Sequence, residues 1–143
     1  MKAICVAALV VWPIASQAQD VCGALQAHLN GAAVRAEIPK ITGIDPSCRS
    51  SLAQSGATSL HCGWPFQYRA SQAKDAFLAL VEDVQACLGP DASRVGDPKV
   101  NHPDFYELQV FGVAEGEVGV SLKDKASLQK TYVFLRITPA SPS

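Results

Sequence analysis

The fold of this chain is predicted most clearly by residues 58–88, which read TSLHCGWPFQYRASQAKDAFLALVEDVQACL. The first part is typical of a strand, because large or apolar side chains occupy alternate positions from Leu60 to Tyr68. The second part is typical of an amphipathic helix, whose apolar residues recur at helical spacing: Ala73, Phe77, Leu80, Val84 and Cys87. The helix is expected to end at Gly89-Pro90, since glycine suits a left-handed cap and proline cannot continue a helix.

This predicted strand and helix carry two of the cysteines, Cys62 and Cys87. From Cys62 the strand advances about 20 Å at roughly 3.3 Å per residue. The returning helix covers about 24 Å at roughly 1.5 Å per residue. The two sulfurs are therefore expected at the same level on the packed faces, which predicts a Cys62–Cys87 disulfide. By elimination, Cys22 would pair with Cys48.

Residues 1–18 have the pattern of a secretory signal peptide. Lys2 precedes an apolar run from Ala3 to Ala15, and Ser16-Gln17-Ala18 predicts cleavage after Ala18. The apolar run is shorter than the about 20 residues that a membrane-spanning helix needs, so no membrane anchor is expected. We therefore predict a secreted or periplasmic protein in which residues 19–143 form a single globular domain. Its remaining even number of cysteines predicts two disulfides, because the destination is oxidising.

The rest of the chain predicts an α+β fold. An N-terminal helix is expected over residues 20–33, and residues 34–44 could form a short edge strand or the end of that helix. Residues 42–57 and 91–104 have the composition of long loops. Residues 105–113, 117–123 and 131–138 alternate as three strands of a meander. Together these segments predict an N-terminal helix and a mostly antiparallel sheet of about four strands.

Composition and motifs exclude several functions. The chain has 12 basic and 13 acidic residues, a balance that gives no support to nucleic-acid binding. It contains no Cys-x-x-Cys, and its histidines stand apart from one another and from the cysteines, so neither a metal site nor a cofactor is expected. No nucleophile elbow, His-Glu-x-x-His motif or phosphate-binding glycine loop occurs. An enzyme is therefore less expected than a binding protein, although catalysis stays open.

The aromatic residues of the meander suggest a binding surface. We expect the sheet face away from the central helix to present Phe111, Tyr132 and Phe134, because that helix can cover only one face. Alternatively, the first helix covers these aromatics or they belong to the core. Lys123, Lys125 and the nearby Lys130 are interpreted as a solvated hairpin tip that discourages edge aggregation.

The two predicted loops suggest a second candidate site. If the central helix runs back along its strand, both loops leave the same end of the sheet, which would bring Arg49 near Arg94. A weak catalytic candidate is His102 with Asp104, to which His61 could come close if the strands are neighbours.

Three functions are consistent with these features. The first is a small exported, non-catalytic module that binds or inhibits another exported protein. The second is an exported enzyme or ligand-binding domain that uses His102 and Asp104 near His61 and Arg94. The third is a structural homodimer.

Overall fold

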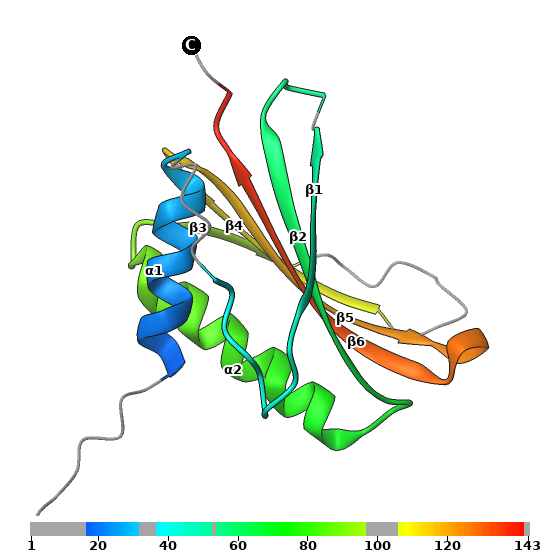
Figure 1. The fold of residues 1–143 in the computed structure, drawn as a ribbon. Helices are drawn as coiled ribbons and strands as arrows, with labels where there is room; N and C mark the ends of the chain where they lie inside the picture. Colours follow the sequence, from blue (N-terminus) through cyan, green and yellow to red (C-terminus); the bar gives the residue numbers. More distant parts are fainter. Residues whose placement is uncertain (1–16, 32–36, 53, 97–105, 142–143) are drawn as a thin grey trace, which may run out of the picture.

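The computed structural model describes residues 17–31, 37–52, 54–96 and 106–141 and shows two helices on one face of a six-stranded sheet (Figure 1). The helices are α1 (Gln17–Leu29) and α2 (Ser71–Leu88). The strands are β1 (Ser47–Leu52), β2 (Thr58–Gln67), β3 (Ser93–Gly96), β4 (Tyr106–Val113), β5 (Gly116–Lys125) and β6 (Lys130–Pro139), and the 3-10 helix η1 (Ala126–Leu128) joins β5 to β6. Their order across the sheet is β1-β2-β6-β5-β4-β3, with every neighbouring pair antiparallel. The predicted α+β class is confirmed.

The strand and helix predicted from residues 58–88 are confirmed as β2 and α2. Cys62, Trp64 and Phe66 are buried on one face of β2, as their alternation requires. α2 ends where Gly89, at φ 84°, donates its backbone N–H to the carbonyl of Gln85 at 3.0 Å. A positive φ favours glycine, so the sequence signal for the end of this helix has a direct structural cause.

The core lies between the two helices and one face of the sheet. The apolar alternation of β5 and β6 supplies its largest part: Val118, Val120, Leu122, Val133, Leu135 and Ile137 are all buried. α2 covers these strands with Phe77, Leu80 and Val84, and α1 adds Leu25. Each such side chain stabilises the fold by about 1.5–3 kcal/mol when it leaves water. Neither of the two described helices covers the opposite face of the sheet (Figure 1).

The sheet has six strands rather than the predicted four or so, because two short edge strands form where long loops were expected. β1 lies within the predicted loop 42–57, and β3 lies within the predicted loop 91–104. Every residue of both strands is exposed, so neither strand shows the apolar alternation by which strands are recognised in a sequence. Pairing with β2 and β4 holds them in place.

The predicted disulfide pairing is wrong: the structure joins Cys22 to Cys87 and Cys48 to Cys62. Cys48 of the unforeseen strand β1 lies directly opposite Cys62 of β2, with their Cα atoms 4.1 Å apart. Residues that face each other across antiparallel strands are already close enough for this bond.

The second disulfide joins the two helices. The prediction assumed that α2 packs over its own preceding strand, but α2 packs mainly on β5 and β6, with α1 beside it. Cys87 therefore meets Cys22 of α1, at a Cα–Cα distance of 5.3 Å. Two disulfides indicate an oxidising, extracellular environment.

The N-terminal prediction falls mostly outside the described residues. The expected signal peptide covers residues 1–18, of which the structure describes only the backbone of residues 17 and 18, within α1. Secretion and cleavage after Ala18 therefore remain predictions. In the part of the chain that the structure describes, no helix is long and apolar enough to span a membrane.

Candidate functional site

The open face of the sheet, which neither described helix covers, contains a groove of about 500 Å³. It extends over the five strands from β1 to β4 in sheet order, with residues of β6 at its centre. Because residues paired across strands share a face, the register identifies the side chains that meet there. We call this depression the open-face groove.

Two stacked rings form the apolar part of the groove. Tyr132 and Phe134 are two residues apart on β6 and so project from the same face. Their ring centroids lie 5.3 Å apart with an interplanar angle of 10°. The Phe134 ring leans over Gly63 of β2, where an added Cβ would lie only 2.8 Å from the ring atom Cε1. We refer to the two rings as the aromatic platform, and Gly63 makes room for it.

Small residues beside the platform create the hollow. Phe134 is paired with Gly63 on one side and with Ser121 on the other, and Ser47 of β1 follows next to Gly63. Gly119 lies two residues before Ser121 on the same face of β5. A face of large side chains would be flat, whereas this row of small side chains lowers the surface next to the rings.

One group of basic residues lies on a transverse row of the groove. Arg49 of β1 is opposite His61 of β2, and His61 is opposite Arg136 of β6. Arg136 donates from Nη2 to Oε1 of Glu117 at 2.6 Å. On the described strands, Glu117 is the one carboxylate at an open-face position.

A second basic group comes from β5. Lys123 Nζ lies 5.8 Å from the ring centroid of Tyr106. Lys125 Nζ lies 5.5 Å from the ring centroid of Tyr132 and 5.9 Å from that of Phe134. Distances of this size allow cation–π attraction, so the lysines rest near the aromatic rings while their charge faces the groove.

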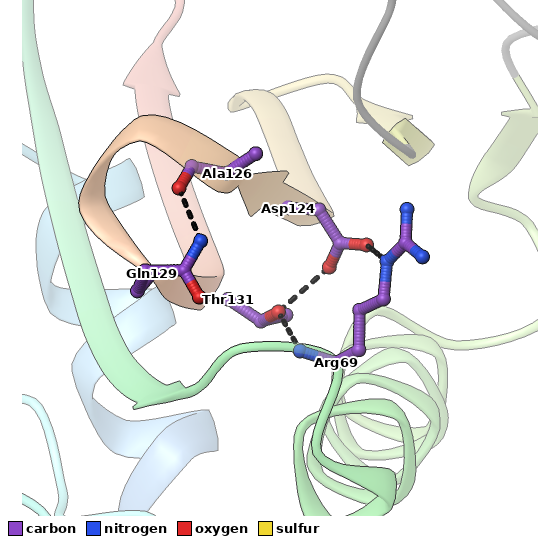
Figure 2. Close-up of polar contacts among 5 residues, drawn as sticks. All are labelled: Arg69, Asp124, Ala126, Gln129 and Thr131. Atoms are coloured by element: carbon purple, nitrogen blue, oxygen red, sulfur yellow. Dashed lines mark hydrogen bonds and ion pairs between the residues drawn. The ribbon is translucent and has the colours of Figure 1, made fainter.

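A polar cluster around the buried side chains of Asp124 and Thr131, on the other face, determines where these lysines point (Figure 2). Asp124 is 5% exposed and accepts hydrogen bonds from Thr131 Oγ1 at 2.6 Å and from Arg69 Nε at 3.2 Å. The backbone N–H of Arg69 donates to Thr131 Oγ1 at 2.8 Å. Since neighbouring residues of a strand point to opposite faces, anchoring Asp124 inward directs Lys123 and Lys125 outward.

The interpretation of these lysines as protection for a sheet edge is therefore wrong. β5 and β6 lie in the middle of the sheet, and the edges are β1 and β3. A hydrogen bond within the connection between β5 and β6 stabilises that turn. There Gln129, at φ 50°, donates from Nε2 to the carbonyl of Ala126 at 2.7 Å (Figure 2).

His61 is the titratable group of the groove whose pKa is shifted. Partial burial lowers its pKa below 6.5, and the positive charges of Arg136 and then Arg49 lower it further. Its Nε2 lies 2.9 Å from Oγ of Ser51. The imidazole is therefore neutral at neutral pH and becomes charged only in acid.

The structure brings together some of the predicted site residues. His61, Arg49, Tyr132 and Phe134 all line the groove. His102 and Asp104 lie outside the described residues, so their predicted role stays a prediction. Within the described residues, no cluster of three or more His, Cys, Asp or Glu side chains could hold a metal ion.

Two other predicted binding residues lie elsewhere. Phe111 is 0% exposed, because its pairing with Val118 puts it on the helix-covered face; its assignment to a surface patch is wrong. Arg94 shares that face and lies over the Phe111 ring, 5.5 Å from its centroid. Arg49 and Arg94 are on opposite edge strands, about 24 Å apart at roughly 4.8 Å per strand spacing, so the expectation that they are neighbours is also wrong.

Three charged residues of this site were not predicted to bind a ligand: Lys123 and Lys125, which were interpreted as a hairpin tip, and Arg136. The signal was present in the alternation of residues 117–125 and 131–138. Once Val118 and Val133 are assigned to the core, these charges must lie on the opposite face.

Comparison of the chain with protein-family models, curated proteins and solved structures finds no match.

Proposed function

We propose that this protein is an exported, non-catalytic binding module that holds a partner protein in the open-face groove. The observation that carries the proposal is the aromatic platform, Tyr132 stacked on Phe134, beside a hollow of about 500 Å³ on the sheet face opposite the two described helices. Concave sites that combine apolar rings with a few polar groups are typical of ligand recognition. Export is supported by the two disulfides and by the predicted signal peptide.

The same geometry supports binding over catalysis. Ser51 and His61 are within hydrogen-bond distance, as in a nucleophile and its base. Among the described residues, however, no carboxylate is paired with the imidazole to orient it. The enzyme hypothesis also required Arg94 near His61, and these residues lie on strands that are not neighbours and on opposite faces of the sheet.

The test compares the exported, disulfide-bonded protein with a Tyr132→Ser, Phe134→Ser double variant as baits for exported proteins of the same source. Val95→Ser is the matched control, because Val95 is 63% exposed on β3 and does not line the groove. We expect a stoichiometric partner with the parent and the control, and its loss with the double variant.

Two results would contradict this function. One is a partner that the double variant retains at equal stability. The other is a concentration-dependent dimer mass for the parent with no captured partner, which would favour the structural homodimer.

A further inference from the structure

We infer that the open-face groove binds an extended acidic peptide segment of the partner protein, with an apolar side chain midway between two carboxylates. This inference rests on the proposed function and adds the chemistry of the ligand.

The charge of the open face differs in sign from that of the whole chain. The chain has a formal net charge of −1. Among the described residues that line the groove, the charged ones are Arg49, Lys123, Lys125 and Arg136, and none is acidic. Glu117, at the margin, offsets one of these charges through its ion pair with Arg136. A positive groove on a slightly negative protein favours a short anionic segment. A long polyanion would extend beyond the groove and be repelled by the negative charge of the rest of the protein.

The charges form two groups on either side of Phe134 along β6. Arg136 of β6 belongs to one group. Lys123 belongs to the other, and its pairing with Tyr132 gives the position of that group along β6. Positions 132 and 136 of β6 are about 13 Å apart at roughly 3.3 Å per residue. A single phosphate or carboxylate can contact only one group, whereas an extended peptide with acids four residues apart can contact both.

Phe134, one ring of the aromatic platform, lies between these two groups. Phe134 is two residues from Arg136 and two from Tyr132, and it shares their face of β6. In an extended peptide, residues two and four positions on from an acid also share its face. The matching ligand therefore has an acid, an apolar residue two positions later and a second acid two positions after that.

The probe is a fluorescein-labelled peptide with the sequence Gly-Ser-Glu-Ser-Phe-Ser-Glu-Ser-Gly, measured by fluorescence anisotropy against the full disulfide-bonded protein. The comparison peptide replaces both glutamates by glutamine. We expect binding of the acidic peptide that weakens with added salt, and at least about tenfold weaker binding of the neutral one.

Protein variants locate the contacts. Arg136→Gln and Lys123→Gln should each weaken binding of the acidic peptide about tenfold, as loss of a charge-assisted hydrogen bond does. Lys74→Gln is the charge-matched control, because Lys74 is exposed on α2, away from the groove, and should leave the affinity unchanged. Thermal unfolding of each variant verifies that the fold is intact.

Several outcomes would overturn the inference. One is binding of the neutral peptide as tightly as the acidic one. Another is binding of the acidic peptide by the Arg136→Gln and Lys123→Gln variants as tightly as by the parent. A third is binding of a single-stranded oligothymidylate or inorganic phosphate in place of the peptide. If the captured partner is lost with the Tyr132→Ser, Phe134→Ser variant but retained with Arg136→Gln and Lys123→Gln, the proposed function stands and the acidic ligand is wrong. If the groove variants do not affect capture, the proposed function itself fails.

Discussion

The two disulfides close loops of very different length, and this difference predicts the order of their contributions to stability. A Cys48→Ala, Cys62→Ala variant keeps only the Cys22–Cys87 bond. A Cys22→Ala, Cys87→Ala variant keeps only the Cys48–Cys62 bond. Each variant thus contains one closed loop whose free-energy contribution can be measured separately.

The magnitudes follow from the sequence separations. Cys22 and Cys87 are 65 residues apart, and Cys48 and Cys62 are 14 residues apart. Loss of loop-closure entropy from the unfolded chain then stabilises the protein by about 4.3 kcal/mol for the long loop and about 3 kcal/mol for the short one. The bond between α1 and α2 is therefore expected to contribute roughly 1.3 kcal/mol more than the bond between β1 and β2.

The assay is urea unfolding of each variant, followed by circular dichroism, with and without a reducing agent. The comparison is made within one variant, so any cavity left by alanine at the buried position of Cys62 is present in both measurements. With an m-value of about 1.5 kcal/mol/M, reduction should lower the midpoint by about 2.9 M for the variant that keeps Cys22–Cys87 and by about 2 M for the other.

Equal midpoint shifts, or a larger shift for the variant that keeps Cys48–Cys62, would refute the loop-entropy reasoning. Peptide mapping of the oxidised parent tests the pairing itself. A peptide that joins Cys62 to Cys87 would restore the pairing predicted from the sequence and contradict the structure.

Three further predictions concern single residues. Phe111→Ala should lower the free energy of unfolding by about 3–5 kcal/mol in urea titrations, because it leaves a cavity in the core, without altering the charges of the groove. Asp124→Ala should cost about 1–3 kcal/mol in the same assay, since it leaves the buried hydroxyl of Thr131 without its acceptor; an unchanged midpoint would contradict a role for this contact. The lowered pKa of His61 means that the unfolded chain binds its proton more tightly. Its contribution to stability is therefore present above about pH 6.5 and lost as the pH falls through the folded pKa. Urea midpoints at about pH 7.5 and about pH 5.5 should differ less for His61→Gln than for the parent, and equal pH dependence would contradict the shift.

Local patterns in the sequence were sufficient to predict the elements that bury one face. The alternation of Cys62, Trp64 and Phe66 identified β2, and helical spacing with a terminal glycine identified α2. They were insufficient for β1 and β3, since every residue of those strands is exposed and neither strand has a buried apolar face.

For the candidate site, the sequence identified Tyr132 and Phe134 as one face of a strand but assigned Phe111 to that same face. Alternation separates the two faces of each strand, yet it does not say which face of one strand continues which face of the next. That choice is made by the register between β4, β5 and β6 and by the helices, which cover Phe111 and leave Tyr132 open.

The sequence by itself therefore determined the helices, the strands with a buried face and the presence of disulfides. Only the tertiary structure decided which cysteines pair and which charged residues come together in the open-face groove. Cys22 and Cys87 are 65 residues apart, and Arg49 and Lys123 of the groove come from β1 and β5, which are far apart in the sequence. The physical reason is that hydrophobic periodicity acts over neighbouring residues, whereas a disulfide or a groove depends on strand order and on how the helices cross the sheet.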